Sequence, residues 1–212
     1  LSRLEYRGYD SSGIAILEGS HIKCFRSVGR IDGLREKVGK ENLQSICGIA
    51  HTRWATHGKP TEENAHPHRS PSGTFAVVHN GIIENSEEIK RTLLKGNEFK
   101  SETDTEVVPQ LLQKYYTGDM FETVSKVISM LRGAYALGII SLYDQDHIYA
   151  VRKGAPLIVG LGEECNFIAS DIPAVLEKTR DIYLLDDGEI VILDTDGSIK
   201  ITDSKLISKT GG

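Results

Sequence analysis

Residues 134–143 read AYALGIISLY, and after a gap of three residues the segment 147–152 reads HIYAVR. Both are short runs rich in aliphatic and aromatic residues, so each predicts a β-strand. Further strands are predicted at 156–161, 166–170, 182–185, 189–193 and 198–202, with Asp-Gly turns before the last two. One helix is predicted among them, at 172–178. Strands joined by short turns favour antiparallel pairing.

The first two thirds of the chain predict a second group of strands and a group of helices. A hairpin is expected from 13–17 and 22–28, followed by a helix from Ile31 that ends at Gly39. Strands are expected at 47–53 and 74–79, separated by a long loop without regular structure. Helices are expected at 85–95, from Thr103 or Asp104 to 116, and at 119–130. Strands, then helices, then strands linked by hairpins indicate an α+β domain with largely antiparallel sheets.

Length and composition predict a folded domain and exclude several partners. The 212 residues carry 25 Lys and Arg against 30 Asp and Glu, a net charge of −5, and 39% are hydrophobic. We therefore expect one domain, no nucleic-acid partner and no polybasic membrane patch. The longest apolar run, 134–142, is far shorter than the ~20 residues that a membrane-spanning helix needs. Three widely spaced cysteines and a charged first segment predict a cytoplasmic protein.

Polar residues suited to chemistry gather between 51 and 81. Five of the seven histidines and the single tryptophan lie there. Arg53 ends a predicted strand and opens a loop rich in glycine and proline, so it is a candidate binder of a substrate carboxylate or, equally, a surface arginine. The histidines also raise the alternative of a zinc hydrolase, although no HExxH motif is present.

Two further positions have both a catalytic and a structural interpretation. Asn80 and Gly81 follow an apolar strand and predict either two oxyanion donors or a plain turn. Asp104 predicts either a helix cap or a carboxylate that pairs with an ammonium group. Cys47 is expected to be buried and structural, so these residues include no nucleophile.

Several motifs, in order along nearly the whole chain, resemble one enzyme family. They are LEYRGYDS at 4–11, HTRWATHG at 51–58, NAHPH at 64–68, HNGIIEN at 79–85 and SETDTE at 101–106. LRGAYA at 131–136 and FIASD at 167–171 extend the match. The chain resembles the glutaminase domains of the glucosamine-6-phosphate synthases, the glutamine:fructose-6-phosphate aminotransferases. Similar domains serve amidophosphoribosyltransferase, asparagine synthetase and glutamate synthase.

The resemblance implies an N-terminal-nucleophile hydrolase fold, a four-layer αββα sandwich with two antiparallel sheets. It also implies roles for individual residues. Arg53 would hold the α-carboxylate of glutamine and Asp104 its α-ammonium group, while Asn80 and Gly81 would form the oxyanion hole. The loop that closes over glutamine would include Trp54, Thr56, His57 and His66. Arg7 would line the site near the nucleophile.

In that family the nucleophile is an N-terminal cysteine, which together with the opening strand and helix would precede Leu1. The chain as given is therefore expected to lack glutaminase activity on its own. Sugar-isomerase domains that bind fructose 6-phosphate would follow Gly212, and the full-length protein would be a homodimer that needs no metal or cofactor. The alternatives are a glutaminase domain of a relative such as amidophosphoribosyltransferase, the zinc hydrolase using the histidines from His51 to His79, and a non-catalytic glutamine-binding module.

Overall fold

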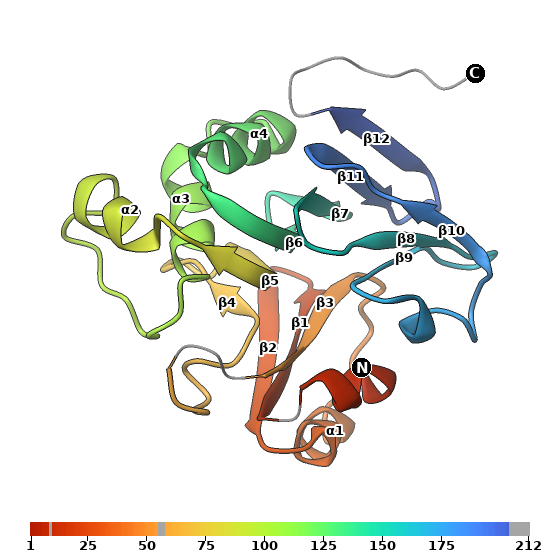
Figure 1. Cartoon of the computed structure of the whole chain (residues 1–212). Helices are drawn as coiled ribbons and strands as arrows, with labels where there is room; N and C mark the ends of the chain where they lie inside the picture. The colour runs from red at the N-terminus through yellow and green to blue at the C-terminus, as the bar shows by residue number, and fades with distance from the viewer. Residues whose placement is uncertain (9, 55–57, 204–212) are drawn as a thin grey trace.

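A six-stranded antiparallel sheet forms the centre of the molecule in a computed structural model that describes residues 1–8, 10–54 and 58–203 (Figure 1). Its strands, in spatial order, are β12 (Ile199–Asp203), β11 (Glu189–Asp194), β7 (Asp144–Lys153), β6 (Gly133–Ser141), β5 (Phe75–Ile83) and β4 (His68–Arg69). The segment 134–143 supplies β6, which pairs along nine residues of β5. The prediction of an antiparallel, hairpin-linked sheet is confirmed.

Two three-stranded antiparallel sheets form a second layer. One has the order β2 (His21–Val28), β1 (Ser11–Glu18), β3 (Gly48–Arg53), and the other β10 (Asp181–Leu184), β8 (Ile158–Leu161), β9 (Phe167–Ala169). Both face the same side of the large sheet. At Gly138 of β6, an added Cβ would lie 2.9 Å from Ile168 of β9 and 3.8 Å from Ile49 of β3. A glycine here lets both small sheets approach the large one.

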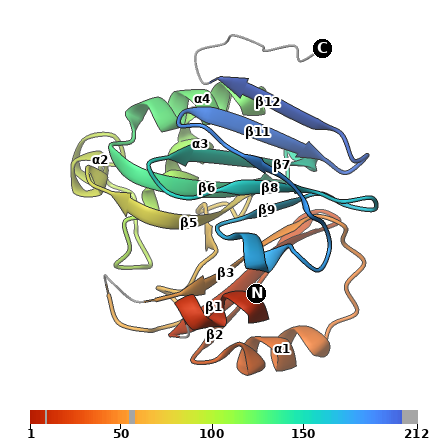
Figure 2. The same ribbon diagram turned by 45° about the vertical axis from the view of Figure 1, so that its right-hand side comes forward.

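Helices cover the two outer faces (Figures 1 and 2). α2 (Ser86–Thr92), α3 (Val107–Tyr115) and α4 (Met120–Met130) lie on the large sheet, and α1 (Ile31–Gly39) lies on the sheet of β1 and β2. Alternation along β6 illustrates this, because Leu137 and Ile139 pack with the helices while Ala136 and Ile140 face the second layer. The order helix, sheet, sheet, helix confirms the expected α+β sandwich.

The structure corrects several predicted boundaries. Asn80 and Gly81 lie inside β5 rather than after it, and the short strand β4 lies within the loop expected to be structureless. α2 is shorter than expected. α3 begins at Val107, because Asp104 accepts a hydrogen bond from the backbone of Ile83 (2.6 Å) instead of capping the helix. The expected helix at 172–178 is only a 3₁₀ turn, η2 (Ile172–Ala174).

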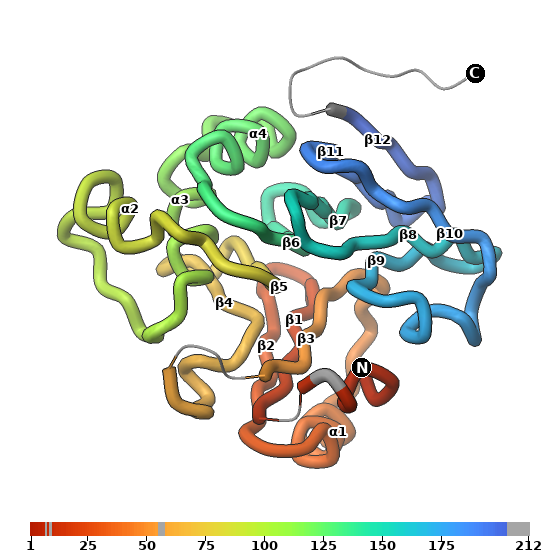
Figure 3. Tube along the Cα trace, viewed as in Figure 1, coloured from red at the N-terminus to blue at the C-terminus, as the bar shows by residue number. Residues whose placement is uncertain are grey.

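Other local predictions are confirmed. α1 has the expected bounds, and the Asp119 side chain caps α4 by accepting a hydrogen bond from the Glu122 amide at 2.8 Å. The 3₁₀ turn η1 (Ser2–Arg7), which the sequence did not predict, lies beside η2, as the trace in Figure 3 shows, and Tyr6 donates a hydrogen bond to Asp171 (2.6 Å). Over the described residues, no helix combines the length and the apolar character that crossing a membrane requires.

Candidate functional site

The ends of β3 and β5 and the loop 101–106 meet at one edge of the two sheet layers. β5 enters from the large sheet and β3 from the second layer. A hydrogen bond crosses between the layers, from His51 Nε2 on β3 to Asn80 Oδ1 on β5, at 2.7 Å. Most residues that the sequence singled out lie at this edge, where strands end and polar side chains face the space between the layers.

Asn80 and Gly81 occupy the last part of β5. Asn80 is partly buried and Gly81 is exposed. Gly81 has φ of +116°, and an added Cβ would lie 2.1 Å from the carbonyl oxygen of Ala134 on β6. Only glycine fits here, because β6 approaches closely and the backbone is in a left-handed region that other residues avoid. The pair is thus part of a rigid strand end and not a free turn.

Asp104 is held at the same edge by its own loop. Its Oδ2 accepts a hydrogen bond from the Ile83 amide at 2.6 Å, and its Oδ1 lies 3.9 Å from His79 Nδ1. The loop closes around the buried carboxylate of Glu106, which accepts bonds from the Lys100 amide (2.9 Å), the Ser101 amide (2.7 Å) and the Ser101 hydroxyl (2.6 Å). The carboxylate of Asp104 therefore has a fixed position and remains 22% exposed.

Arg53 ends β3 and is buried, with 6% of its surface exposed. Its Nη1 donates to the carbonyl of Lys59 at 3.3 Å. Burial lowers the pKa of Arg53, and the carboxylates of Asp10, Asp104 and Glu102 nearby act to raise that pKa again. The guanidinium of an arginine held at a strand end presents a planar fork that can bind the carboxylate of a ligand.

The neighbours of Arg53 differ in how they are placed. Trp54 is exposed. Gly8 packs against the backbone where Arg53 joins Trp54, since an added Cβ would lie 2.7 Å from the Arg53 carbonyl carbon. This contact brings the N-terminal turn η1 to the site. The side chain of Arg7, and all of Thr56 and His57, lie outside the described residues.

Four histidines fill the interior beside these groups. The rings of His51 and His66 are 4.3 Å apart, and those of His66 and His68 are 4.8 Å apart. Burial lowers the pKa of His51 to about 4 and lowers the pKa values of His66, His68 and His79, although Asp104 opposes the shift at His79. These imidazoles are neutral at pH 7.

Threonine hydroxyls hold the histidine rings. Thr105 Oγ1 lies 2.8 Å from His79 Nδ1 and 3.3 Å from His66 Nε2, and Thr103 Oγ1 lies 3.1 Å from His68 Nε2. Within 1–8, 10–54 and 58–203, no three His, Cys, Asp or Glu side chains are arranged to hold a metal ion. The four described histidines of the zinc hypothesis, His51, His66, His68 and His79, form a hydrogen-bonded packing cluster.

Asn64 and Glu102 form a contact that sequence reasoning missed. The Glu102 amide donates to Asn64 Oδ1 at 2.8 Å, and Asn64 Nδ2 donates to Glu102 Oε2 at 3.2 Å and to the Lys59 carbonyl at 3.0 Å. The pair thus ties the segment after Gly58 to the loop that carries Asp104. The motifs NAHPH and SETDTE were the only sequence signal, and they did not show that the two segments touch.

The cysteines do not supply a nucleophile at this edge. Cys47 is buried, just ahead of β3, and burial together with the charges of Asp146 and Asp144 raises the pKa of its thiol to about 11. Cys24 is half-buried and Cys165 is exposed. The prediction that Cys47 is buried is confirmed, and its thiol is protonated at neutral pH.

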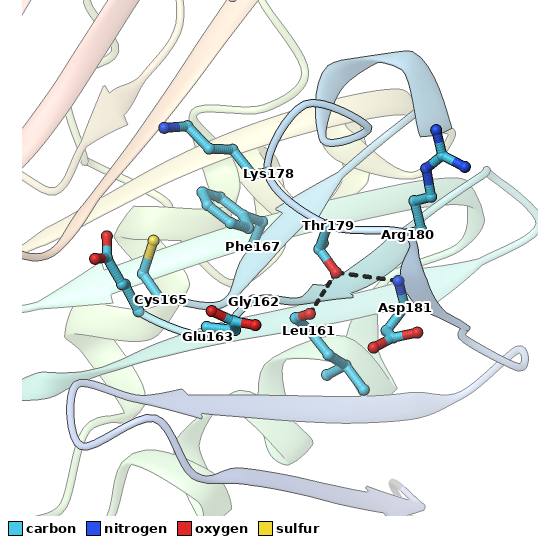
Figure 4. A pocket seen from close by; sticks show the side chains of 10 residues that line it. Leu161, Gly162, Glu163, Cys165, Phe167, Lys178, Thr179, Arg180 and Asp181 are labelled. Carbon is cyan, nitrogen blue, oxygen red and sulfur yellow. Dashed lines mark hydrogen bonds between the residues drawn. The ribbon is translucent and has the colours of Figure 1, made fainter.

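A cavity of about 420 Å³ lies elsewhere, between the turn after β8 and the segment before β10 (Figure 4). Lys178, Phe167 and Cys165 are among its lining residues. The Thr179 hydroxyl, which donates to the Leu161 carbonyl, and the Asp181 amide, which donates to Thr179 at 3.0 Å, hold one wall together. It shares no residue with the site at the ends of β3 and β5.

Comparison with known proteins decides the family. The family model described as a glutamine amidotransferase domain matches residues 51–177, more than half of the chain. The chain belongs to this family. The matched region of the amidotransferase contains both strand ends and the loop that form the candidate site.

Three curated relatives of this amidotransferase chain are named glutamine–fructose-6-phosphate aminotransferase (isomerizing). The protein of Clostridium tetani is 53% identical over 97% of the chain, and that of Caldanaerobacter subterraneus subsp. tengcongensis is 55% identical over 92%. The protein of Aquifex aeolicus is 52% identical over 92%. The chain spans about a third of the length of these relatives, 34%, 32% and 33% respectively.

Solved structures agree on the fold. The glutamine phosphoribosylpyrophosphate amidotransferase of B. subtilis, complexed with ADP and GMP, has a TM-score of 0.81 at 25% identity. The match covers 97% of this chain and 45% of the B. subtilis chain. A second structure, described as the allosteric regulatory enzyme of purine biosynthesis, has a TM-score of 0.84 at 24% identity, covering 98% and 45%. The amidotransferase fold expected from the motifs is confirmed.

Proposed function

We propose that this chain binds glutamine, and that the natural protein containing it hydrolyses the glutamine side-chain amide to release ammonia. The observation that carries the proposal is the meeting of Arg53, Asp104 and Asn80 at one edge of the sheets. A free amino acid presents a carboxylate, an ammonium group and a side-chain amide. A buried guanidinium, a fixed carboxylate and an amide donor match these three groups.

Each residue has a role in this proposal. Arg53 pairs with the α-carboxylate of glutamine, and Asp104 accepts hydrogen bonds from its α-ammonium group. The side-chain NH₂ group of Asn80 and the backbone N–H of Gly81 donate hydrogen bonds to the substrate oxygen, which becomes negative as the glutamine amide is attacked. We further propose that the loop closing over glutamine includes Trp54, Thr56, His57 and His66, and that Arg7 lines the site.

The proposed nucleophile is the thiol of an N-terminal cysteine that lies before Leu1 in the natural protein. The thiol adds to the amide carbon while the α-amino group of the same residue takes its proton. The tetrahedral species expels ammonia and leaves a glutamyl thioester, which water hydrolyses to glutamate. The protonated thiol of Cys47 is not suited to this step.

The names of the curated relatives support a further assignment. We propose that residues 1–212 form one glutaminase domain, and that sugar-isomerase domains of the same protein use the ammonia to convert fructose 6-phosphate to glucosamine 6-phosphate. The reaction requires no cofactor. A cytoplasmic homodimer is the proposed state of the full-length protein.

The first test uses Arg53→Ala in the natural protein that contains this chain. Removing a buried charge partner of the substrate should raise the KM for glutamine by about 10²-fold or more. Arg91→Ala, at an exposed position of α2, is the matched control and should leave the KM unchanged. Glutamate release measures both. A normal KM in Arg53→Ala would refute the assignment of Arg53 to the carboxylate.

A second test addresses the acceptor of the ammonia. Fructose 6-phosphate and phosphoribosyl pyrophosphate are supplied in turn with glutamine, and the amino product is identified by mass spectrometry. We expect glucosamine 6-phosphate only. Phosphoribosylamine would instead assign the protein to the amidophosphoribosyltransferases, and glutamine binding without any product would favour a binding module.

A further inference from the structure

We propose that His51 is a positioning residue that orients the carboxamide of Asn80, so that the amide hydrogens of Asn80 face the reacting oxygen of the substrate. This inference rests on the proposed glutaminase function. His51 lies on β3 in the second sheet layer, and Asn80 on β5 in the large sheet. The two residues are therefore held by separate sheets, and their hydrogen bond fixes the side chain on one sheet relative to the side chain on the other.

The direction of that hydrogen bond determines the orientation of Asn80. His51 Nε2 lies 2.7 Å from Asn80 Oδ1. A carboxamide oxygen only accepts hydrogen bonds, so Nε2 carries the hydrogen and donates. If the carboxamide turned over, its NH₂ group would meet the N–H of His51 and two donors would face each other. The Nδ2 hydrogens of Asn80 are thus directed away from His51.

The imidazole of His51 is itself held in place. The ring of His66 lies against it at 4.3 Å with a tilt of 33°. The Nδ1 of His66 accepts a hydrogen bond from the His79 amide at 3.4 Å, and its Nε2 lies 3.3 Å from the Thr105 hydroxyl. His66 is thus fixed on two sides, and its packed ring limits how far the His51 ring can turn away from Asn80.

The same network reaches the second proposed binding group. Thr105 Oγ1 is 2.8 Å from His79 Nδ1 and 3.5 Å from Asp104 Oδ1. Asn80 and Asp104 therefore lie at the two ends of one chain of packed and hydrogen-bonded side chains. Such a chain preserves the spacing between the group that donates to the oxyanion and the group that accepts from the ammonium.

His51 acts here as a neutral donor. Burial lowers its pKa to about 4, and the bond to Asn80 opposes that shift only in part. Since the ring does not gain or lose a proton near pH 7, its effect on the reaction comes through geometry. Losing it should leave the pH profile of the reaction unchanged in shape.

The test compares His51→Leu with His51→Gln in the natural protein that contains this chain. Leucine removes the donor, whereas glutamine keeps a side-chain N–H that can reach Asn80. Removing one oxyanion donor costs about 10²- to 10³-fold in kcat, so we expect His51→Leu to lower kcat by about 10²-fold with the KM for glutamine changed less than twofold. His51→Gln should recover most of that loss.

A double-mutant cycle shows whether the effect passes through Asn80. In an Asn80→Ala background, His51→Leu should cause no further fall in kcat, because the group it orients is gone. Equal losses in both backgrounds would overturn the proposal. So would a rise in KM with unchanged kcat, or a limb of the pH profile that disappears only in His51→Leu.

A measurement without turnover separates this inference from the proposed function. In protein labelled with ¹⁵N-histidine, nitrogen shifts should show His51 as the Nε2–H tautomer. The Nδ1–H tautomer would overturn the proposal even in an active enzyme. A wild-type protein that releases no glutamate from glutamine would refute the proposed function, and the tautomer would still decide the orientation of Asn80.

Discussion

The histidines at the candidate site and His147, near the start of β7 in the large sheet, have opposite electrostatic surroundings. His51, His66, His68 and His79 are packed against one another and hydrogen-bonded to neutral groups, and their pKa values are lowered by burial. His147 lies between two carboxylates, at 2.6 Å from Asp144 and 2.9 Å from Asp194. Burial alone would lower the pKa of His147, but the two aspartates outweigh it and raise the pKa.

The difference shows how one residue type serves two purposes. At the site, neutral rings act as hydrogen-bonding spacers beside Arg53, where further positive charge would be unfavourable. On β7, the ring of His147, whose pKa is raised, joins the start of β7 to β11, because His147 and Asp194 are partners in the strand register. Protonation should therefore disrupt the first region and strengthen the second.

The largest expected effect is a loss of stability in acid that originates at the site. Between pH 6 and 5 the unfolded chain protonates His51, His66 and His68 near their ordinary pKa of 6.5, while the folded chain, with a pKa of about 4 at His51 and pKa values well below 6.5 at the other two, does not. As the pH is lowered, the free energy of unfolding should decrease by about 1.4 kcal/mol per pH unit for each proton that only the unfolded chain binds. Urea unfolding at a series of pH values measures the slope.

Single substitutions show which histidines cause the pH dependence of the free energy of unfolding. His68→Gln removes one titrating ring and should reduce the slope by about 1.4 kcal/mol per pH unit. His147→Gln is the matched control, because a histidine with a raised pKa is protonated in both states below pH 6 and contributes no slope there. An unchanged slope in His68→Gln would mean that the buried ring takes up its proton before the protein unfolds.

The next effect concerns the carboxylates of the two regions. Glu106 is buried and accepts hydrogen bonds from neutral amide and hydroxyl groups, whereas Asp144 and Asp194 both contact the ring of His147. Glu106→Gln places an NH₂ group against the amide and hydroxyl donors of the loop. We expect a loss of about 2 kcal/mol and weaker glutamine binding, since the loop also holds Asp104. Chemical denaturation and calorimetry measure the two effects.

Glu98→Gln is the control for this change. Glu98 is exposed and lies near the same loop, so its substitution should alter the free energy of unfolding by less than about 0.5 kcal/mol. Equal stability of Glu106→Gln and the wild-type protein would show that the loop does not depend on the buried negative charge.

Much of the fold could be predicted from the sequence because its signals are local. Apolar runs mark β6 and β7, Asp-Gly turns precede β11 and β12, and the Asp119 cap marks α4. The failures occurred where distant contacts override local preference. The Asn80-Gly81 pair is typical of a turn, yet pairing with β6 extends β5 through it. Asp104 is typical of a helix cap, yet its carboxylate bonds to Ile83.

The candidate site was only partly predictable for the same reason. Arg53, Asn80 and Asp104 could be named because each residue type has a characteristic chemistry. Their supporting partners could not, since the bonds of His51 to Asn80 and of Asn64 to Glu102 join segments 29 and 38 residues apart. Nothing in residues 51–81 distinguishes a histidine that binds a metal from one that holds an amide. Only the packing of two sheets shows which role His51 has.

A smaller effect tests the second region directly. His147→Gln should lower the free energy of unfolding by about 1 kcal/mol at pH 6, because the ion pairs with Asp144 and Asp194 are partly exposed and screened. A raised pKa in the folded state means that this stabilisation is complete below pH 6.5 and is lost as pH rises through the raised value. The difference from wild type should therefore shrink by pH 9. A constant difference would contradict a charged His147.

The smallest effect separates the aspartate from its ion pair. Tyr149 donates a hydrogen bond to Asp144 Oδ2 at 2.6 Å, on the oxygen that His147 does not contact. Tyr149→Phe should cost about 0.5–1 kcal/mol at pH 6. It should also let Asp144 turn, which weakens the pair with His147 and lowers the pKa of that ring toward its ordinary value. An NMR titration of His147 measures this change. If its pKa stays where it is in the wild-type protein, Asp194 and the strand register are sufficient to hold the charged ring, and Tyr149 contributes only its own hydrogen bond.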